Sequence, residues 1–417
     1  MALPSNLLYS LKPESVPSKA METKFLSSAG AGAVAPGSQI KIHIAGDRGS
    51  YLDTANSLLE FTVNNTSGDT AFSIDGHAAS FIQRLEVYWN STLVESISDY
   101  NVLFSSLYDA SVSPSQRGMG DAILAGTGAS DTLSRTGTTL AAESHRTFFI
   151  PILGLLGINA EKYLPMGFGE MRLELTLANN NDPIVAAGAT TWTVSSCQYV
   201  GSIIKLDASA QMMIEQSLVD GQYQIHSSSY RAFSGAIAAQ KKDQVSSLDM
   251  YVPGNFASLK TLYVAQRFTD KLNAVGSSSI SDRTTNGLED YYFRIGATSV
   301  PQTPVVGVVE SYRELLKARH LLSTGQYEIA LRKGNYELQS HASTVGSFLI
   351  GQDCESFSGK SGVIMSGMDT TNSPVYLIAR YKPTQVDPPG LTVNVFAEFD
   401  QILYLDINAG GQAMVRF

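Results

Sequence analysis

The sequence predicts an all-β protein built from two consecutive β-sandwiches of Greek-key type. Three observations support this fold class. Apolar and polar residues alternate with the period of two that is typical of half-buried strands. Helical periodicity is confined to two segments, both in long connections between groups of strands. The order of strand groups, helix and long loop in the first half recurs in the second half, which indicates a duplicated architecture.

Several segments of the first half alternate clearly. In MRLELTL, residues Met171 to Leu177, four apolar residues alternate with Arg172, Glu174 and Thr176. The tripeptide Asn90 to Thr92 is interpreted as a turn that leads into the strand candidate LVESI. The other predicted strands of this half are LEFTVN (59–64), RLEVYW (84–89) and TWTVSSCQYV (191–200).

The second half shows the same pattern. Its last two strand candidates, LTVNVFAEF and QILYLDI, are separated only by Asp400, so they form either one bent strand or a tight hairpin. The remaining candidates are QVSSLDMYV (244–252), SLKTLYVAQRF (258–268), DYYFRIG (290–296) and SPVYLIARYK (373–382).

The two predicted helices cover Asp99 to Ala110 and Glu310 to Leu322. The first follows Ser98, a candidate N-cap, and Gly325 lies just past the end of the second. The stretch KLDASAQMMIEQS, residues 205–217, is the candidate linker between the two halves. Residues 1–37 contain four prolines and are predicted to be an irregular arm, with a short helical piece near Asn6 to Leu11. The predicted units are therefore an arm (1–37), a first sandwich (38–207) and a second sandwich (208–417).

The composition restricts the functional class. Only 16% of the 417 residues are charged, against roughly 25% in typical proteins. A low fraction of charged residues is typical of a protein whose surface is covered by neighbouring subunits, and equally of a β protein rich in Ser and Thr. The net charge is −9 and no basic run exceeds Lys241–Lys242, so direct nucleic-acid binding is not expected. We expect no secretory signal, no helical membrane span and no disulfide framework, because Cys197 and Cys354 lie far apart.

The chain contains no convincing catalytic motif. In SGKSG (358–362), Cys354 stands where a phosphate-binding loop needs glycine. No GxSxG motif occurs. The histidines never form HxH or HExxH; they are His43, His77, His145, His226, His320 and His341. We therefore predict no catalytic, cofactor-binding or metal-binding residues, and no cofactor. Two alternatives stay open at this point: a glycan-binding or glycan-cleaving β-sandwich protein with paired carboxylates, and a bicupin-like metal enzyme.

Two stretches of the chain have a recognisable order of elements. The first is FFIPILGLLGINAEKYLPMGFGEMRLELTLANNND (148–182), in which a proline-containing apolar strand leads through a Leu-Pro corner to a leucine-rich strand and an Asn-rich turn. The second is FIQRLEVYWNSTLVESISDYNVLFSSLYD (81–109), with a strand, turn, strand and helix. Both stretches resemble the double jelly-roll major capsid proteins of the adenovirus hexon, tailless membrane-containing phage, virophage and polinton-like virus lineage. The resemblance implies two consecutive eight-stranded jelly rolls with short helices in the connecting loops.

The resemblance also implies a function. Such proteins are not enzymes; three chains form a pseudo-hexagonal capsomer, and capsomers assemble into an icosahedral virion shell. The expected partners are two further copies in a homotrimer, neighbouring capsomers, minor capsid or penton proteins, and an internal membrane beneath the shell if one is present. The arm is expected on the inner side of the shell, and connections 109–145 and 269–289 on the outer side. The expected location is the virion, after synthesis inside the host cell.

The apolar run FFIPILGLLG (148–157) is too short for a membrane-spanning helix. We interpret FFIPI as a sandwich strand with Pro151 near an edge or a strand end, where a missing N–H is tolerated. We interpret LGLLGI as a loop whose leucines are buried by a neighbouring sandwich or by another subunit. A charge at Leu155 or Leu156 is accordingly expected to block trimer formation.

Overall fold

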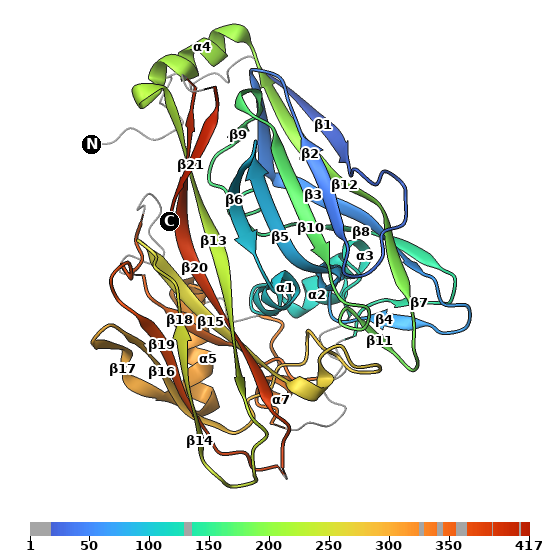
Figure 1. Cartoon of the computed structure of the whole chain (residues 1–417), viewed down its shortest axis with the longest axis vertical. Helices are drawn as coiled ribbons and strands as arrows, with labels where there is room; N and C mark the ends of the chain where they lie inside the picture. Colours follow the sequence, from blue (N-terminus) through green and yellow to red (C-terminus); the bar gives the residue numbers. More distant parts are fainter. Residues whose placement is uncertain are drawn as a thin grey trace, which may run out of the picture.

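The computed structural model has two β-sandwiches that lie side by side in one chain (Figure 1). It describes residues 18–128, 136–324, 329–339, 345–355, 365–385, 387–407 and 410–417. The hydrogen-bonded sheets of strands β1–β12 and those of strands β13–β21 are separate. An isolated bridge between Ala160 and Ser227 links the two halves.

The first sandwich packs two sheets face to face. One has the strand order β1-β12-β3-β8, with β9 also paired to β3, and the other has the order β2-β10-β5-β6. The strands of this half are β1 (Ser18–Leu26), β2 (Gln39–Ile44), β3 (Ser50–Asn65), β5 (Ile82–Trp89), β6 (Thr92–Ile97), β8 (His145–Ile150), β9 (Leu164–Pro165), β10 (Met171–Leu177) and β12 (Trp192–Leu206). A small third sheet has the order β11-β4-β7 and contains β4 (Phe72–Ile74), β7 (Thr139–Leu140) and β11 (Ile184–Ala186).

The second sandwich has the sheets β13-β20-β15-β18, with β21 paired to β20, and β14-β19-β16-β17. Its strands are β13 (Gln222–Ile237), β14 (Ser246–Val252), β15 (Leu259–Phe268), β16 (Leu288–Ile295), β17 (Thr298–Val306), β18 (Ile350–Asp353), β19 (Val375–Tyr381), β20 (Leu391–Asp406) and β21 (Gln412–Arg416). Pro301 and Pro304 lie in β17, an edge strand, where proline is tolerated because one side of the strand needs no N–H donors.

The two halves share one topology. If the main strands of each half are numbered from one to eight along the chain, one sheet has the order 1-8-3-6 and the other has the order 2-7-4-5, in both halves. Two four-stranded antiparallel sheets connected in this way form a jelly roll. The predicted duplication is therefore present at the level of strand order.

Short helices occupy the connections between the strands. The connection after β6 contains α1 (Tyr100–Asp109), α2 (Pro114–Gly118) and α3 (Gly120–Leu124). The equivalent connection after β17 contains α5 (Gly307–Ala318), α6 (Leu321–Thr324) and α7 (Lys333–Tyr336). Helix α4 (Ala208–Ser217) joins the two sandwiches. Single 3-10 turns lie at Ala78–Phe81, Met166–Phe168, Val219–Gly221 and Thr269–Lys271. In the described part of the chain, no helix is long and apolar enough to cross a membrane.

The structure corrects three sequence predictions and decides between the two alternatives of a fourth. Residues 18–26, which were assigned to the irregular arm, form strand β1 at the edge of the first sheet, paired along its whole length with β12. The strand candidates on either side of Asp400 are one continuous strand, β20, and not a hairpin. The helix predicted to end at Leu322 is interrupted because His320 adopts a left-handed conformation (φ 55°). The residue before α1 is Asp99 rather than Ser98, and Asp99 forms no side-chain cap.

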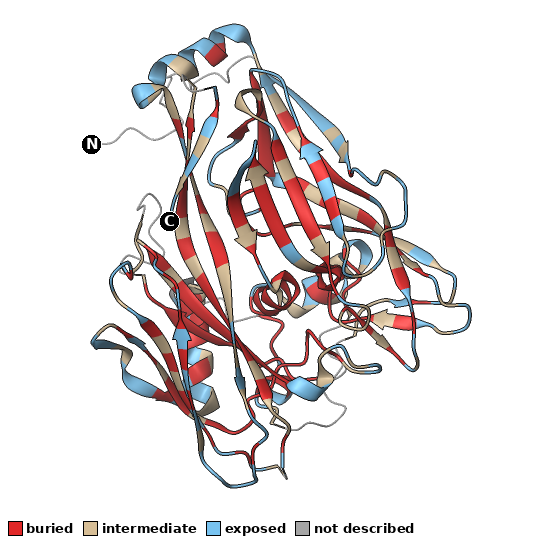
Figure 2. Ribbon diagram, in the orientation of Figure 1, coloured by how far each residue is buried: buried red, intermediate tan, exposed pale blue. Residues whose placement is uncertain are grey.

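The core explains why the alternating segments form strands. Along β10 the apolar residues Met171, Leu173, Leu175 and Leu177 are buried, whereas Arg172 and Thr176 are only partly buried. Buried residues follow both sheets of each sandwich and the α1 helix between the sandwiches (Figure 2). Burying one such side chain stabilises the fold by roughly 1.5–3 kcal/mol. The two sandwiches and the helices that separate them are thus held by one extended apolar core.

Candidate functional site

No set of three or more His, Cys, Asp or Glu side chains in the described residues could hold a metal ion. His77 is buried between the rings of Phe104 and Tyr108, and its Nδ1 accepts a hydrogen bond from Ala79 N. Burial lowers the pKa of His77 to about 3. His341 and the SGKSG segment (358–362) lie outside the described residues.

The most extensive polar contacts lie instead between the two sandwiches. Asp75, in the first sandwich, accepts hydrogen bonds from Ile280 N at 2.7 Å, from Ser281 N at 3.2 Å and from the Ser281 hydroxyl. Burial raises the pKa of Asp75, although these donors oppose the shift. Asp182 similarly accepts a hydrogen bond from the Ser279 hydroxyl at 2.6 Å. The connection between β15 and β16 therefore packs into the first sandwich.

A buried ion triad reinforces the same junction. The carboxylate of Asp109, at the end of α1, forms ion pairs with the guanidinium groups of Arg117 in α2 and Arg283 of the second sandwich. Arg283 Nη2 lies 2.5 Å from Asp109 Oδ2. All three side chains are at most 2% exposed. A buried carboxylate needs such partners because desolvation of an isolated charge costs far more than one hydrogen bond returns. The triad thus fixes the position of the second sandwich against α1.

These contacts correct one functional prediction. Connection 269–289 was expected to form an outward-facing loop, but residues 278–288 are buried. This segment passes between the sandwiches, and Arg283 and Ser281 lie in it. The local sequence does not indicate this burial, because the segment is polar (SSISDRTTNGL) and key partners, such as Asp75 for Ser281 and Asp109 for Arg283, lie far away in the sequence.

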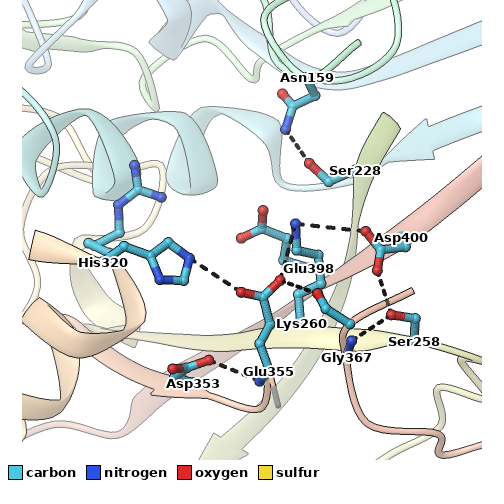
Figure 3. A network of polar contacts seen from close by, with 12 residues as sticks. Asn159, Ser228, Ser258, Lys260, His320, Asp353, Glu355, Gly367, Glu398 and Asp400 are labelled. Atoms are coloured by element: carbon cyan, nitrogen blue, oxygen red, sulfur yellow. Dashed lines mark hydrogen bonds and ion pairs between the residues drawn. The ribbon is translucent and has the colours of Figure 1, made fainter. Parts of the chain in front are cut away.

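A second network, shown in Figure 3, surrounds Lys260 in β15. Its ammonium lies 3.3 Å from Glu355 Oε1 and 3.7 Å from Asp400 Oδ1. Desolvation lowers the pKa of Lys260, but Glu398, Asp400 and Glu355 outweigh it, so the net shift is upward. His320 Nε2 lies 3.4 Å from Glu355 Oε2. These ion pairs join β15, β20 and the segment that follows β18.

The LGLLG loop is buried, as predicted, but within the chain itself. Leu155 and Leu156 are both 0% exposed. Leu155 N donates to Glu95 Oε2 at 2.8 Å, and Leu156 O accepts from the Tyr199 hydroxyl at 2.8 Å. The prediction that these two leucines form a trimer contact is therefore wrong, because no part of either side chain reaches the surface. Pro151 directly follows β8, an edge strand, which confirms its predicted position.

Exposed apolar side chains mark a different surface. Met119 and Ile123 are four residues apart at helix α3, and they are 74% and 73% exposed. Leu124, Ile158 and Arg319 line one hollow of about 250 Å³ beside them. Arg319 Nη2 donates to Ser111 Oγ at 2.6 Å, which joins the helical connections of the two sandwiches. We call the surface formed by Met119, Ile123, Leu124 and Ile158 the helical face.

Two jelly rolls of identical strand order in one chain define the double jelly-roll class of fold. Solved structures of three virus proteins are similar to this chain over nearly its whole length. The PBCV-1 VP54 structure fitted into the virophage Sputnik reconstruction has a TM-score of 0.63 and 12% sequence identity, with 98% of this chain and 99% of that chain covered. The mavirus major capsid protein has a TM-score of 0.57 and 10% identity, with 100% of this chain and 93% of that chain covered. The Faustovirus major capsid protein has a TM-score of 0.58 and 8% identity, with 95% of this chain and 92% of that chain covered. No protein-family model and no curated protein sequence matches the chain. The resemblance to double jelly-roll capsid proteins is therefore one of fold.

Proposed function

We propose that this chain is a non-enzymatic major capsid protein whose trimers form pseudo-hexagonal capsomers of an icosahedral virion shell. The duplicated jelly roll is the observation that carries the proposal. Three chains around an axis bring together six sandwiches of the same strand order, and this gives a nearly six-fold outline from a three-fold assembly. The low charge content agrees with large buried contacts between subunits.

We place the domain boundaries of this capsid protein differently from the sequence prediction. Because β1 belongs to the first sheet, the first jelly roll starts at residue 18 and extends to about 207. The second extends from 208 to 417 and begins with helix α4. The arm is then reduced to residues 1–17. Neighbouring capsomers, minor capsid or penton proteins and an internal membrane are the partners proposed for the assembled shell.

The helical face is our candidate for the contact within the trimer. It carries two of the most exposed apolar side chains of the described residues, and it lies where both sandwiches can contribute to a heterologous contact. Ile123→Asp should weaken the trimer without unfolding the chain, since Ile123 is 73% exposed. Val245→Asp is the matched control, because Val245 is 60% exposed and lies before β14, away from the helical face.

Light scattering and electron microscopy of the purified protein test both proposals. The capsid function predicts a mass of three 44.8 kDa chains and hexagonal particles or shells. A monodisperse monomer at micromolar concentration would contradict it. If trimers form equally well from the Ile123→Asp and Val245→Asp variants, the capsid function stands and the helical face is the wrong interface.

A further inference from the structure

Helix α4 lies at one end of the molecule (Figure 1). Residues beside it line a groove of about 530 Å³. It lies between the last residues of β12, the first residues of β13 and helix α4. Its walls are mainly apolar and include Tyr163, Ile204, Leu206, Ile214, Leu218 and Val219. Val219 is 69% exposed and Tyr163 is 52% exposed, so part of this apolar wall faces solvent within the described chain.

The described chain begins at the rim of this groove. Ser18, the first residue of β1, is paired with Leu206 of β12, and Leu206 is one of the groove residues. Because β1 is antiparallel to β12, the described chain begins beside the C-terminal end of β12, which α4 follows.

Residues 1–17 have the composition to fill an apolar groove, although they lie outside the described residues. Their sequence is MALPSNLLYSLKPESVP, in which Leu7, Leu8 and Leu11 have the spacing of one helix face. An apolar cavity of roughly 150 Å³ holds one benzene-sized molecule. The groove therefore has room for about three side chains of this size.

We propose that residues 1–17 dock into the groove of their own chain, with Leu7, Leu8 and Leu11 against the apolar wall. Tethering favours the arm of the same chain over that of another copy, because a short tether gives an effective concentration on the order of millimolar. The docked arm would cover the exposed wall around Val219 in the free protein. This inference goes beyond the proposed capsid function and does not depend on it.

Disulfide trapping in the full-length chain tests the docking directly. Ser5→Cys is combined with Ser217→Cys, since Ser217 lines the groove. The native Cys197 and Cys354 are buried and leave the new pair to react. We expect a fast intrachain disulfide, seen as a monomer of altered mobility on a non-reducing gel. Ser5→Cys with Ser247→Cys in β14 is the control. A predominantly interchain product, or trapping no faster than in the control, would overturn the proposal.

Competition by a peptide provides a second readout. A labelled peptide of residues 1–17 should bind the full-length variant Leu7→Asp/Leu8→Asp at least tenfold more tightly than the unaltered chain, whose groove is occupied. Adding Val219→Glu to that variant should abolish binding. Adding Met213→Glu should not, because Met213 is also 69% exposed but does not line the groove. Equal peptide affinity for the variant and the unaltered chain would refute arm docking. Both readouts apply to monomers and trimers alike, so failure of trimer formation would not be mistaken for failure of docking.

Discussion

Replacement of Asp109 by asparagine should destabilise the whole molecule, since it leaves two buried guanidinium groups without their shared carboxylate. Arg117 and Arg283 are 2% and 0% exposed. Arg117 keeps a hydrogen bond to Gly128 O at 3.1 Å, and Arg283 keeps one to Ser105 Oγ at 3.4 Å, so neither retains a charged partner from this triad. Breaking a buried ion pair in this way costs about 3–5 kcal/mol of unfolding free energy. At roughly 2–4 °C per kcal/mol for a large domain, the melting temperature should fall by about 6–20 °C.

Differential scanning calorimetry measures this fall, with Asp387→Asn as the matched control. Asp387 pairs with Lys241 at 2.9 Å, but both side chains are more than half exposed, and such a pair contributes roughly 0–1 kcal/mol. The control variant should melt within about 2–4 °C of the unaltered protein. If the two variants melt at the same temperature, the triad does not hold the two sandwiches together.

Three further predictions concern buried groups. Leu155→Asp should abolish folding rather than give a folded monomer, because Leu155 is 0% exposed; a cooperative melting transition in this variant would contradict its burial. Burial raises the pKa of Glu95 from 4.5 to about 7, so the protonated form is favoured in the folded state. The unfolding free energy should therefore fall by up to about 3 kcal/mol between pH 4.5 and pH 7, and urea titrations should show a smaller fall in Glu95→Gln. Burial also raises the pKa values of Cys197 and Cys354 to about 12, so a thiol reagent at pH 8 should modify neither cysteine until denaturant is added; rapid native modification would refute their burial.

Much of the fold was predictable because many of its strands bury alternate apolar residues. Period-two segments such as RLEVYW and MRLELTL lie in β5 and β10 as expected. Strand β13 was missed, since its serine- and alanine-rich sequence QYQIHSSSYRAFSGAI lacks a strong apolar alternation. It forms a strand through sixteen residues of pairing with β20. Strand β1 was missed for a related reason, as most of its residues are exposed and only its pairing with β12 identifies it.

The surfaces of the molecule were harder to predict than its strands. The sequence marked Leu155 and Leu156 as candidate contacts because they form a dense apolar run, yet such a run is also what an interior loop requires. Met119 and Ile123 attract no notice in the sequence, because their exposure depends on how the short helix α3 packs. Ser281, a partner of Asp75, and Arg283, the second partner of Asp109, lie more than 170 positions away, and no local pattern indicates them.

The buried junction has a consequence for synthesis on the ribosome. The strands of the first sandwich are complete at Leu206, but the donors for Asp75 and the second guanidinium for Asp109 lie at residues 280–283. Domains generally fold in order as the chain emerges, N-terminal unit first. The first sandwich therefore emerges before Asp75 has its donors from residues 280–281, and while Asp109 is paired with Arg117 alone. The nascent first sandwich should therefore be less stable than the same sandwich in the finished molecule. These contacts can form only after residues 280–283 have been translated.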